Sequence, residues 1–170
     1  MRPVLAAFGD RVAAAWLDKR DFLSGYDVYA AVSEDGGASF GKDRKAQDSF
    51  GDAIAQWHVT AAGNPRGELV IAWDDERDGT ADIWLLDLDG GDARPLTRCV
   101  RAFCSDPAWN PDSTQVLYQR QEFGGDQGDV SWTWIVDITT VQTRLLFDDP
   151  QVRGADPIWS PDGRRVAVFD

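Results

Sequence analysis

The stretch DPIWSPDGRRVAVF, Asp156–Phe169, repeats an earlier stretch of the chain, DPAWNPDSTQVLY, Asp106–Tyr118. Six residues recur at a constant spacing of 50 positions. They are Asp106, Pro107, Trp109, Pro111, Asp112 and Val116 in the first copy, and Asp156, Pro157, Trp159, Pro161, Asp162 and Val166 in the second. A repeat of about 20 to 50 residues indicates stacked copies of one supersecondary unit. The two copies therefore predict an array of equivalent modules.

Each copy predicts a β-hairpin with one buried aromatic side chain. A short strand ends at the tryptophan, a tight turn follows, and an apolar strand comes next. In the second copy the turn is Pro161-Asp162-Gly163, where proline presets its backbone angle and glycine accepts a positive φ.

These phrases resemble the repeats of TolB-like β-propellers, whose blades carry D-P-x-W-S-P-D-G between their first and second strands. Asp156–Gly163 matches this phrase in full, whereas Asn110 and Ser113 replace the serine and the glycine in the earlier copy. The resemblance implies a β-propeller. It does not imply one function, since such propellers serve as binding scaffolds, as adaptors and as non-catalytic domains of peptidases.

The composition favours an all-β domain. The 170 residues include eight Trp, eight Phe and three Tyr beside sixteen Gly and eight Pro, which suits short strands joined by tight turns. No long window repeats apolar residues at the helical period of about 3.6. A chain of this length can form one domain with its own core. We therefore expect a single partial propeller domain over residues 1–170.

Further matches divide the chain into about three and a half blades of four-stranded antiparallel sheet. Ala15–Asp21 (AWLDKRD) parallels Ala72–Asp78 (AWDDERD), so the earlier units are versions of the same module. The expected blades are approximately residues 3–50, 54–97 and 105–148, with a half blade at 155–170. Closed propellers need about 4 to 8 blades. We expect the rest of a longer polypeptide, or further copies of the chain, to close the ring; the alternative architecture is a curled sandwich.

The stretch SEDGGASF, residues 33–40, resembles the Asp-box of sialidase-like propellers, S-x-D-x-G-x-[ST]-[WF]. The matching residues are Ser33, Asp35, Gly37, Ser39 and Phe40. Ser and Asp side chains can bond the backbone of such a turn, and glycine can adopt its positive φ. We expect a structural hairpin turn whose terminal aromatic packs between sheets.

Two cysteines, Cys99 and Cys104, lie five positions apart in a predicted loop before the third blade. A surface disulfide that clips this loop is expected, and two free thiols are the alternative. A zinc site would need two more ligands, which the neighbouring sequence does not offer. A disulfide would indicate an oxidising compartment.

Charge and hydropathy restrict the partners. Seventeen basic and twenty-nine acidic residues give a net charge of −12, which disfavours nucleic acid. No apolar run reaches the roughly 20 residues that span a bilayer, and the N-terminus lacks the profile of a signal peptide. Either the chain is cytosolic or its signal was removed from the sequence; a disulfide favours the second alternative, and we expect a bacterial protein, extracellular or periplasmic.

Candidate ligand-binding residues lie where loops leave the predicted sheets. The stretch QEFGGDQGDVS, residues 121–131, is expected to be a long loop, and it carries Asp126 and Asp129. Arg20, Arg77 and Arg120 follow second strands in three blades. We expect these five residues to contact a protein or a small polar ligand.

Catalytic and metal-binding patterns are weak. The three arginines resemble the triad of sialidases, but no tyrosine–glutamate pair accompanies them. The single histidine, His58, lies in the apolar stretch QWHVTA and is expected to be a core or edge residue. Nucleophile elbow, P-loop and dinucleotide-binding patterns are absent from the sequence. The carboxylates of Asp87, Asp89 and Asp92 resemble a calcium loop without its bidentate glutamate, so we expect no cofactor, with calcium as the alternative.

The sequence therefore predicts a non-enzymatic propeller scaffold that binds a protein or a small polar ligand. One alternative is part of a glycosidase-like or peptidase-associated propeller. Another is a structural fragment without activity of its own.

Overall fold

The computed structural model describes residues 3–20, 25–47, 56–64, 67–77, 79–125, 128–149 and 152–169. Within these ranges the regular secondary structure is all β, in three antiparallel sheets of four strands and one of two. This confirms the expected fold, a partial propeller of about three and a half blades. No helix among the described residues could cross a membrane.

Each sheet contains strands that are consecutive in the sequence. The first has β1 (Val4–Phe8), β2 (Arg11–Asp18), β3 (Asp27–Ser33) and β4 (Arg44–Lys45), and the second β5 (Gln56–Gly63), β6 (Leu69–Asp75), β7 (Asp82–Asp87) and β8 (Arg94–Pro95). The third has β9 (Ala102–Trp109), β10 (Gln115–Gly125), β11 (Gly128–Asp137) and β12 (Thr143–Leu145), and the fourth β13 (Ala155–Trp159) and β14 (Val166–Phe169).

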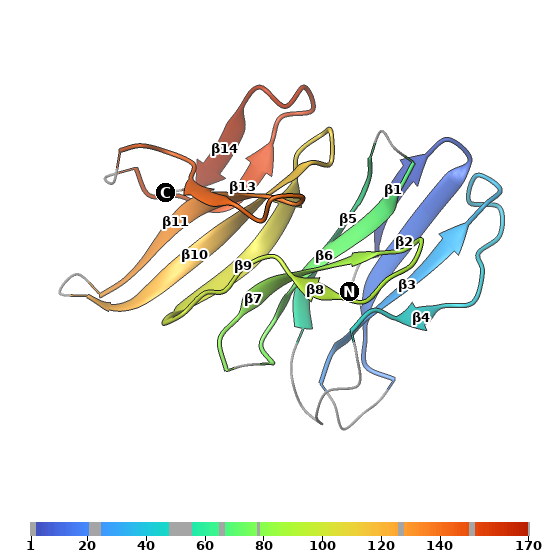
Figure 1. Ribbon diagram of the computed structural model, residues 1–170, viewed down its shortest axis with the longest axis horizontal. Coiled ribbons are helices and arrows are strands. Elements are labelled where there is room, and N and C mark those ends of the chain that lie inside the picture. Colours follow the sequence, from blue (N-terminus) through green and yellow to red (C-terminus); the bar gives the residue numbers. More distant parts are fainter. Residues whose placement is uncertain are drawn as a thin grey trace.

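The sheets follow one another from the first, on the right of Figure 1, to the fourth, on the left. The first strands are neighbours across the sheets, because β1 contacts β5, β5 contacts β9, and β9 contacts β13. These four first strands form the inner side of the array. The separate four-strand sheets exclude the curled sandwich.

Two apolar clusters hold neighbouring sheets together. Between the first and second sheets, Trp73 and Ile71 are fully buried against Ala13 and Val28. Between the second and third, Tyr118 is 1% exposed and packs in one cluster with residues of both sheets. Burial of apolar area is the main stabilising term here. Of the tryptophans at repeated positions, Trp73 lies in the first of these clusters and Trp109 packs against the second.

The predicted loop at residues 121–131 is wrong. The strands β10 and β11 continue through it as a hairpin, with Gln121 opposite Ser131 and Glu122 opposite Val130. The cause is that β9 starts earlier than expected and pairs with the same extension of β10. Phe103 of β9 and Phe123 of β10 meet edge to face at 4.6 Å, a favourable pair of aromatic side chains.

The disulfide between Cys99 and Cys104 is present, but it is not at the surface. Cys99 is 3% exposed and Cys104 is fully buried. Both backbone amides are anchored to the start of the second sheet's third strand: Cys99 N donates to Asp82 Oδ1 at 2.7 Å and Cys104 N to the Ala81 carbonyl at 2.8 Å. This anchoring draws the connection between the second and third sheets into the core.

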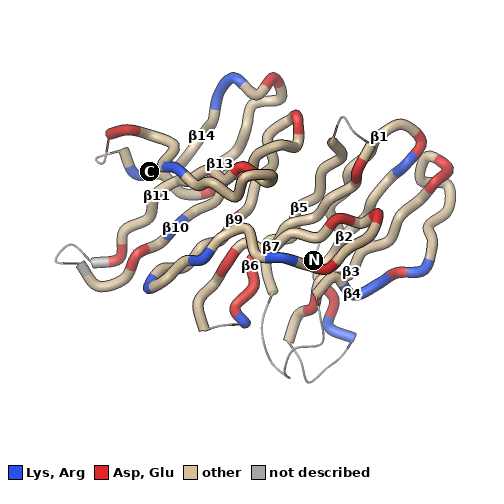
Figure 2. The backbone as a smooth tube through the Cα atoms, in the orientation of Figure 1, with Lys and Arg blue, Asp and Glu red and all other residues tan. Residues whose placement is uncertain are grey.

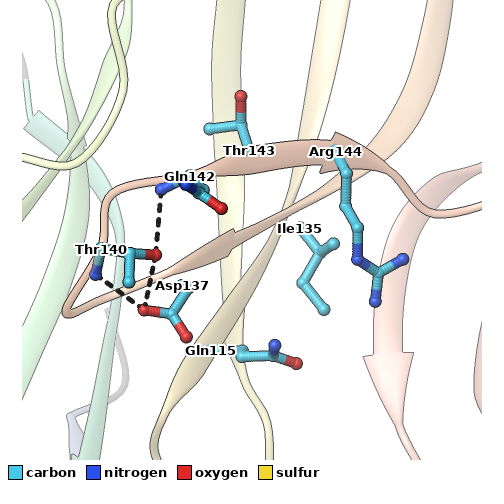
Figure 3. A pocket seen from close by; sticks show the side chains of 7 residues that line it. All are labelled: Gln115, Ile135, Asp137, Thr140, Gln142, Thr143 and Arg144. Carbon is cyan, nitrogen blue, oxygen red and sulfur yellow. Dashed lines mark hydrogen bonds between the residues drawn. The ribbon is translucent and has the colours of Figure 1, made fainter.

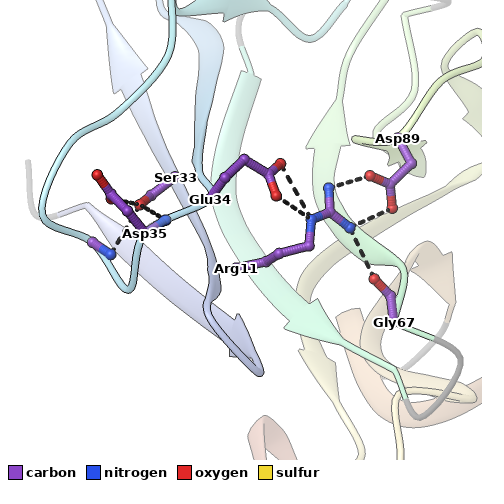
Figure 4. Close-up of polar contacts among 7 residues, drawn as sticks. Arg11, Ser33, Glu34, Asp35, Gly67 and Asp89 are labelled. Atoms are coloured by element: carbon purple, nitrogen blue, oxygen red, sulfur yellow. Dashed lines mark hydrogen bonds and ion pairs between the residues drawn. The ribbon is translucent and has the colours of Figure 1, made fainter.

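The turn at residues 33–40 has the expected hydrogen bonds. Gly37 N donates to Ser33 Oγ at 2.9 Å, and Ser39 N donates to Asp35 Oδ1 at 2.8 Å; Figure 4 shows this turn. The hydroxyls of Ser39 and Ser33 lower the pKa of Asp35 to about 2. The expected packing of Phe40 is wrong. Its side chain is 42% exposed, because the turn projects beyond the end of β3, where no described sheet covers it.

Candidate functional site

The inner strands of three sheets share one irregularity. In β5, β9 and β13 two residues oppose one residue of the next strand, which defines a β-bulge. The first residues of the three bulges are His58, Asp106 and Asp156. All three have positive φ, at 44°, 55° and 46°. The corresponding position in the first sheet is Arg2, which lies outside the described residues.

The residue types at these bulges fit their backbone. Asp and His are enriched among the non-glycine residues that adopt a positive φ. Pro107 and Pro157, which follow the two aspartates, have no amide hydrogen to leave unpaired at the bulge. At each repeated Asp-Pro pair, the bulge therefore takes the aspartate side chain out of the regular alternation of the strand.

A histidine and two carboxylates meet at this place. The Nδ1 atom of His58 lies 3.0 Å from Asp74 Oδ2, and its Nε2 atom lies 3.4 Å from Asp106 Oδ1. Asp74 comes from β6, and its side chain is only 4% exposed. The side chain of His58 is 54% exposed, so of the two expected positions, core or edge, it takes the edge, on β5, an edge strand of the second sheet. The bulge is the reason, since it takes His58 out of the buried alternation of β5.

The charges of this group are coupled. The hydrogen bond with Asp74 raises the pKa of His58 to about 9, and Asp106 and Asp156 act in the same direction. Burial raises the pKa of Asp74, and its hydrogen bond with His58 opposes that shift. At neutral pH the imidazole of His58 is therefore protonated. The three carboxyl groups around it, those of Asp74, Asp106 and Asp156, outnumber this one imidazolium.

A cavity of about 310 Å³ lies over the three bulges. Its lining consists of His58–Thr60, Asp106–Ala108 and Asp156–Ile158. Asp156 accepts no hydrogen bond from any described residue, and its side chain is exposed. Ile158, 58% exposed, adds an apolar surface beside it. We call this the inner cavity; it can accept a cationic group next to an apolar one.

The described residues that line the inner cavity form no catalytic set. Thr60 supplies the only hydroxyl among them, and the Nδ1 and Nε2 atoms of His58 both face carboxylates. Among the described residues, no three His, Cys, Asp or Glu side chains are placed to hold one metal ion. Acidic positions also occur on all four sheets, as Figure 2 shows, so negative charge is not confined to the cavity.

The three predicted arginines are not brought together. Each pairs with a carboxylate two residues away in its own sheet: Arg20 with Asp18, Arg77 with Asp75, and Arg120 with Glu122. Each also lies over an aromatic ring of the third strand of that sheet, at 3.9, 3.6 and 5.2 Å from the ring centre. Such ion pairs and cation–π contacts hold the arginines within their sheets.

The other predicted polar residues lie apart from the inner cavity. Asp129 is exposed at the tip of the β10–β11 hairpin, and Asp126 lies outside the described residues. In the proposed calcium loop, Asp87 accepts a hydrogen bond from the amide of Asp89, and the carboxylate of Asp89 is bound by Arg11.

The sequence contained a signal for the inner cavity that its interpretation missed. The Asp-Pro pairs at residues 106 and 156 were recognised as fold markers, although they place two of the cavity's carboxylates. His58 carries no repeated phrase, and only the strand register aligns it with Asp106 and Asp156.

Known proteins share the fold of this chain. No protein-family model matches it. An uncharacterised peptidase, YuxL of Bacillus subtilis, is 28% identical over 89 residues, which are 52% of this chain and 13% of that protein. A puromycin hydrolase structure matches 100% of this chain with 28% of its own, at a TM-score of 0.66 and 18% identity. The structure of a putative TolB from Agrobacterium tumefaciens matches 80% of this chain with 47% of its own, at a TM-score of 0.50 and 23% sequence identity.

This likeness shows the propeller fold. The similar structures include a putative TolB, in agreement with the resemblance of the repeated motifs to those of TolB-like propellers. The chain spans 13% of the length of the curated relative and 28% of the puromycin hydrolase. The activities of those longer proteins are therefore not established for this chain.

Proposed function

We propose that this chain is part of a β-propeller that works as a non-catalytic binding module, and that its inner cavity takes a small polar ligand with a positive charge. The observation that carries this proposal is the convergence of three bulges on one cavity. Asp156 supplies a carboxylate that no described residue uses, and Asp106 and Ile158 supply further charge and apolar surface. A primary ammonium group beside a short apolar side chain fits this lining.

The test compares ligands that differ in one charge. Ala-Phe dipeptide and its N-acetylated form are titrated into the protein, and NMR shifts of Thr60 and Ile158 are followed. We expect saturable binding of the free dipeptide and none of the acetylated one. Asp156→Asn should weaken binding about tenfold through loss of a charge-assisted hydrogen bond, whereas Asp129→Asn, on the distant hairpin tip, should leave it unchanged. Equal binding of both dipeptides would refute a charge-selective site.

A peptidase-associated propeller is the second candidate. It is favoured by the sequence likeness to the YuxL peptidase and by the structural likeness to a puromycin hydrolase. In that case the binding module would serve a catalytic domain outside these residues. Purified protein should then turn over neither aminoacyl nor sialoside fluorogenic substrates. Turnover that is lost on His58→Ala or Arg77→Ala would overturn the non-catalytic assignment.

Two further features belong to this proposal. We propose that the turn at residues 33–40 is an Asp-box with a structural role, on the basis of its hydrogen bonds. We also propose an extracellular or periplasmic location, because a disulfide joins the two cysteines. Thiol titration of denatured protein prepared from its native compartment should find no free thiol.

A further inference from the structure

The two ring nitrogens of His58 face carboxylates that differ in burial. Nδ1 lies 3.1 and 3.0 Å from the two carboxylate oxygens of the buried Asp74. Nε2 lies 3.4 Å from Oδ1 of Asp106, a partly exposed side chain that borders the inner cavity. The hydrogen bond at one ring nitrogen decides which nitrogen keeps its hydrogen in the neutral imidazole. In neutral His58 that hydrogen is therefore on Nδ1, and the lone pair of Nε2 faces Asp106.

Nε2 of His58 and Oδ1 of Asp106 need a hydrogen between them. Once the imidazole is neutral both atoms are acceptors, and two acceptors at 3.4 Å repel each other. Ser105 Oγ donates at 2.8 Å to the other oxygen of Asp106, Oδ2, and no further described side chain donates to Oδ1. The hydrogen is supplied either by the Nε2 proton or by an N–H group of a ligand. An ammonium group has three N–H donors, so it can bond Oδ1 and Nε2 together.

The charges that act on His58 come from three strands. They are the carboxylates of Asp74 in β6, Asp106 in β9 and Asp156 in β13. The strand β1, which packs against β5, carries no titratable side chain. The other described charged residues of β2, β3 and β6 are bound to other partners: Arg11 to Glu34 and Asp89, Asp18 to Arg20, Asp27 to Lys45, and Asp75 to Arg77. The three carboxylates therefore set the charge of the imidazole.

A second cavity that contains a carboxylate lacks this arrangement. It has a volume of about 330 Å³ and lies beside the β11–β12 turn (Figure 3). Its Asp137 accepts hydrogen bonds at Oδ1 from the amide and the hydroxyl of Thr140, at 2.8 and 3.0 Å, and Arg144 lines the same cavity. No imidazole shares this carboxylate, and a guanidinium already lies near it. This cavity provides an internal reference for the inner cavity.

We propose that an ammonium group bound in the inner cavity replaces the Nε2 proton of His58 and donates to both Asp106 Oδ1 and Nε2. This inference rests on the proposed function, because it names the atoms that recognise the cationic ligand. On binding, the N–H bond at Nε2 breaks, its electron pair stays on the nitrogen, and the proton passes to water. One cation thus takes the place of another, and the net charge of the cavity does not change.

This exchange makes the affinity depend on pH. The pKa of His58 is about 9, so at neutral pH the ligand must displace a bound proton. Binding and proton release are reciprocal, so a ligand that excludes the proton also lowers the pKa of His58. If exclusion is complete, the dissociation constant should rise about twentyfold from pH ~9.5 to pH ~7.5.

The experiment uses propylamine, a primary ammonium with a short apolar group. Like the lysine side chain, it keeps its charge up to about pH 9.5, so the pH dependence reports the protein and not the ligand. His58 is the only histidine of the chain, so the NMR signals of an imidazole ring belong to it alone. We expect saturating propylamine to lower the pKa of His58 by at least about one unit and to leave the hydrogen on Nδ1. Shifts of Thr60 report the affinity, and Thr140, at the second cavity, should show no saturable shift.

Two variants separate the exchange from simple attraction of charge. His58→Asn suits the positive φ of this position and cannot titrate, so propylamine should bind it with the same affinity at both pH values. Asp106→Asn removes the shared carboxylate, so propylamine should no longer lower the pKa of His58. Asp129→Asn, at the tip of the β10–β11 hairpin, should behave as wild-type protein. Circular dichroism at each pH confirms that every variant is folded.

The outcomes distinguish this inference from the proposed function. Saturable binding at Thr60 with an unchanged pKa of His58 would overturn the exchange and leave the binding site in place. Binding of the Ala-Phe dipeptide without binding of propylamine would also overturn it, because an ammonium group alone would then not be recognised. Failure of both ligands to shift Thr60 at either pH would overturn the proposed function and the exchange together.

Discussion

The interface between the second and third sheets differs from the one between the third and fourth. The former contains Tyr118 at 1% exposure, the buried disulfide and the hydrogen bond that Arg94 donates to the Ile138 carbonyl. The latter has a hydrogen bond from Thr133 to the Gly154 carbonyl at 3.0 Å, but Arg144 makes no hydrogen bond or ion pair with any described residue. Among the described strands, the interface between the second and third sheets is the complete one, with four strands on each side, whereas the fourth sheet contributes two.

The largest contrast between these interfaces should come from substitutions of their packed side chains. Tyr118→Ala should lower the free energy of unfolding by about 3–5 kcal/mol, because it opens a cavity in the buried cluster. Val168→Ala, at the equivalent position of β14 that faces the third sheet, should lower it by only about 1 kcal/mol, since this smaller side chain is only partly buried. Urea unfolding followed by tryptophan fluorescence measures both. Equal losses would show that the fourth sheet is as firmly packed as the third.

The disulfide should give the next largest effect, and only in the complete interface. Replacing Cys99 and Cys104 together by alanine should cost about 2 kcal/mol, because the short loop between them regains conformational freedom in the unfolded chain. The measurement is the urea midpoint of the double variant beside that of oxidised wild-type protein, with reduced wild-type protein as the control for the change of side chain. An unchanged midpoint would mean that the amide anchors to Asp82 and Ala81 hold the connection without the covalent bond.

The sequence predicted the complete interface better than the bulges. The repeated position of Trp109 indicated an aromatic side chain of the core, and Trp109 packs against the cluster between the second and third sheets, because side-chain type and period report burial directly. A bulge depends on which residues are paired across two strands. His58 differs in type from Asp106 and Asp156, so composition could not align the three, and only the strand register did.

The sequence also predicted the ends of strands and the surroundings of turns poorly. Residues 121–131 are rich in Gly and Asp, which favours a loop, but an early start of β9 provided a pairing partner that local composition does not report. Phe40 matched a motif whose local hydrogen bonds formed as expected. Its burial depends on a neighbouring sheet, which is a property of the tertiary arrangement and not of the turn.

The bulge at His58 differs from the other two in its ion pair. His58 pairs with the buried Asp74 of the second strand, whereas neither Asp106 nor Asp156 has a buried counter-ion from the second strand of its own sheet. The pKa of His58 is about 9 in the folded chain and about 6.5 when unfolded. Its contribution to stability is therefore complete below pH ~6.5 and is lost as the pH rises to ~9. Because the imidazole is half exposed, screening reduces this contribution to the order of 1 kcal/mol.

Urea unfolding between pH 6 and pH 10 (~0.5 pH steps) tests this pair. Wild-type protein should lose stability across the window from about 6.5 to 9, and His58→Gln should remove that part of the pH dependence. Asp35, whose pKa is lowered by hydrogen bonds, titrates far below this range and does not interfere. An identical slope in both proteins would assign the pH dependence to other groups.

The smallest effect is expected at the rim between the first and second sheets, where Arg11 joins the two. Its guanidinium binds Glu34 and Asp89 and donates to the Gly67 carbonyl at 3.0 Å, as Figure 4 shows. Arg11→Ala should lower stability by about 0.5–1 kcal/mol, because these contacts are partly exposed to solvent. Glu34→Gln, which removes only the more exposed partner, should cost less, and high salt should reduce the difference between the two variants. A loss from Arg11→Ala as large as that from Tyr118→Ala would mean that polar rim contacts, and not apolar burial, decide how neighbouring sheets are held.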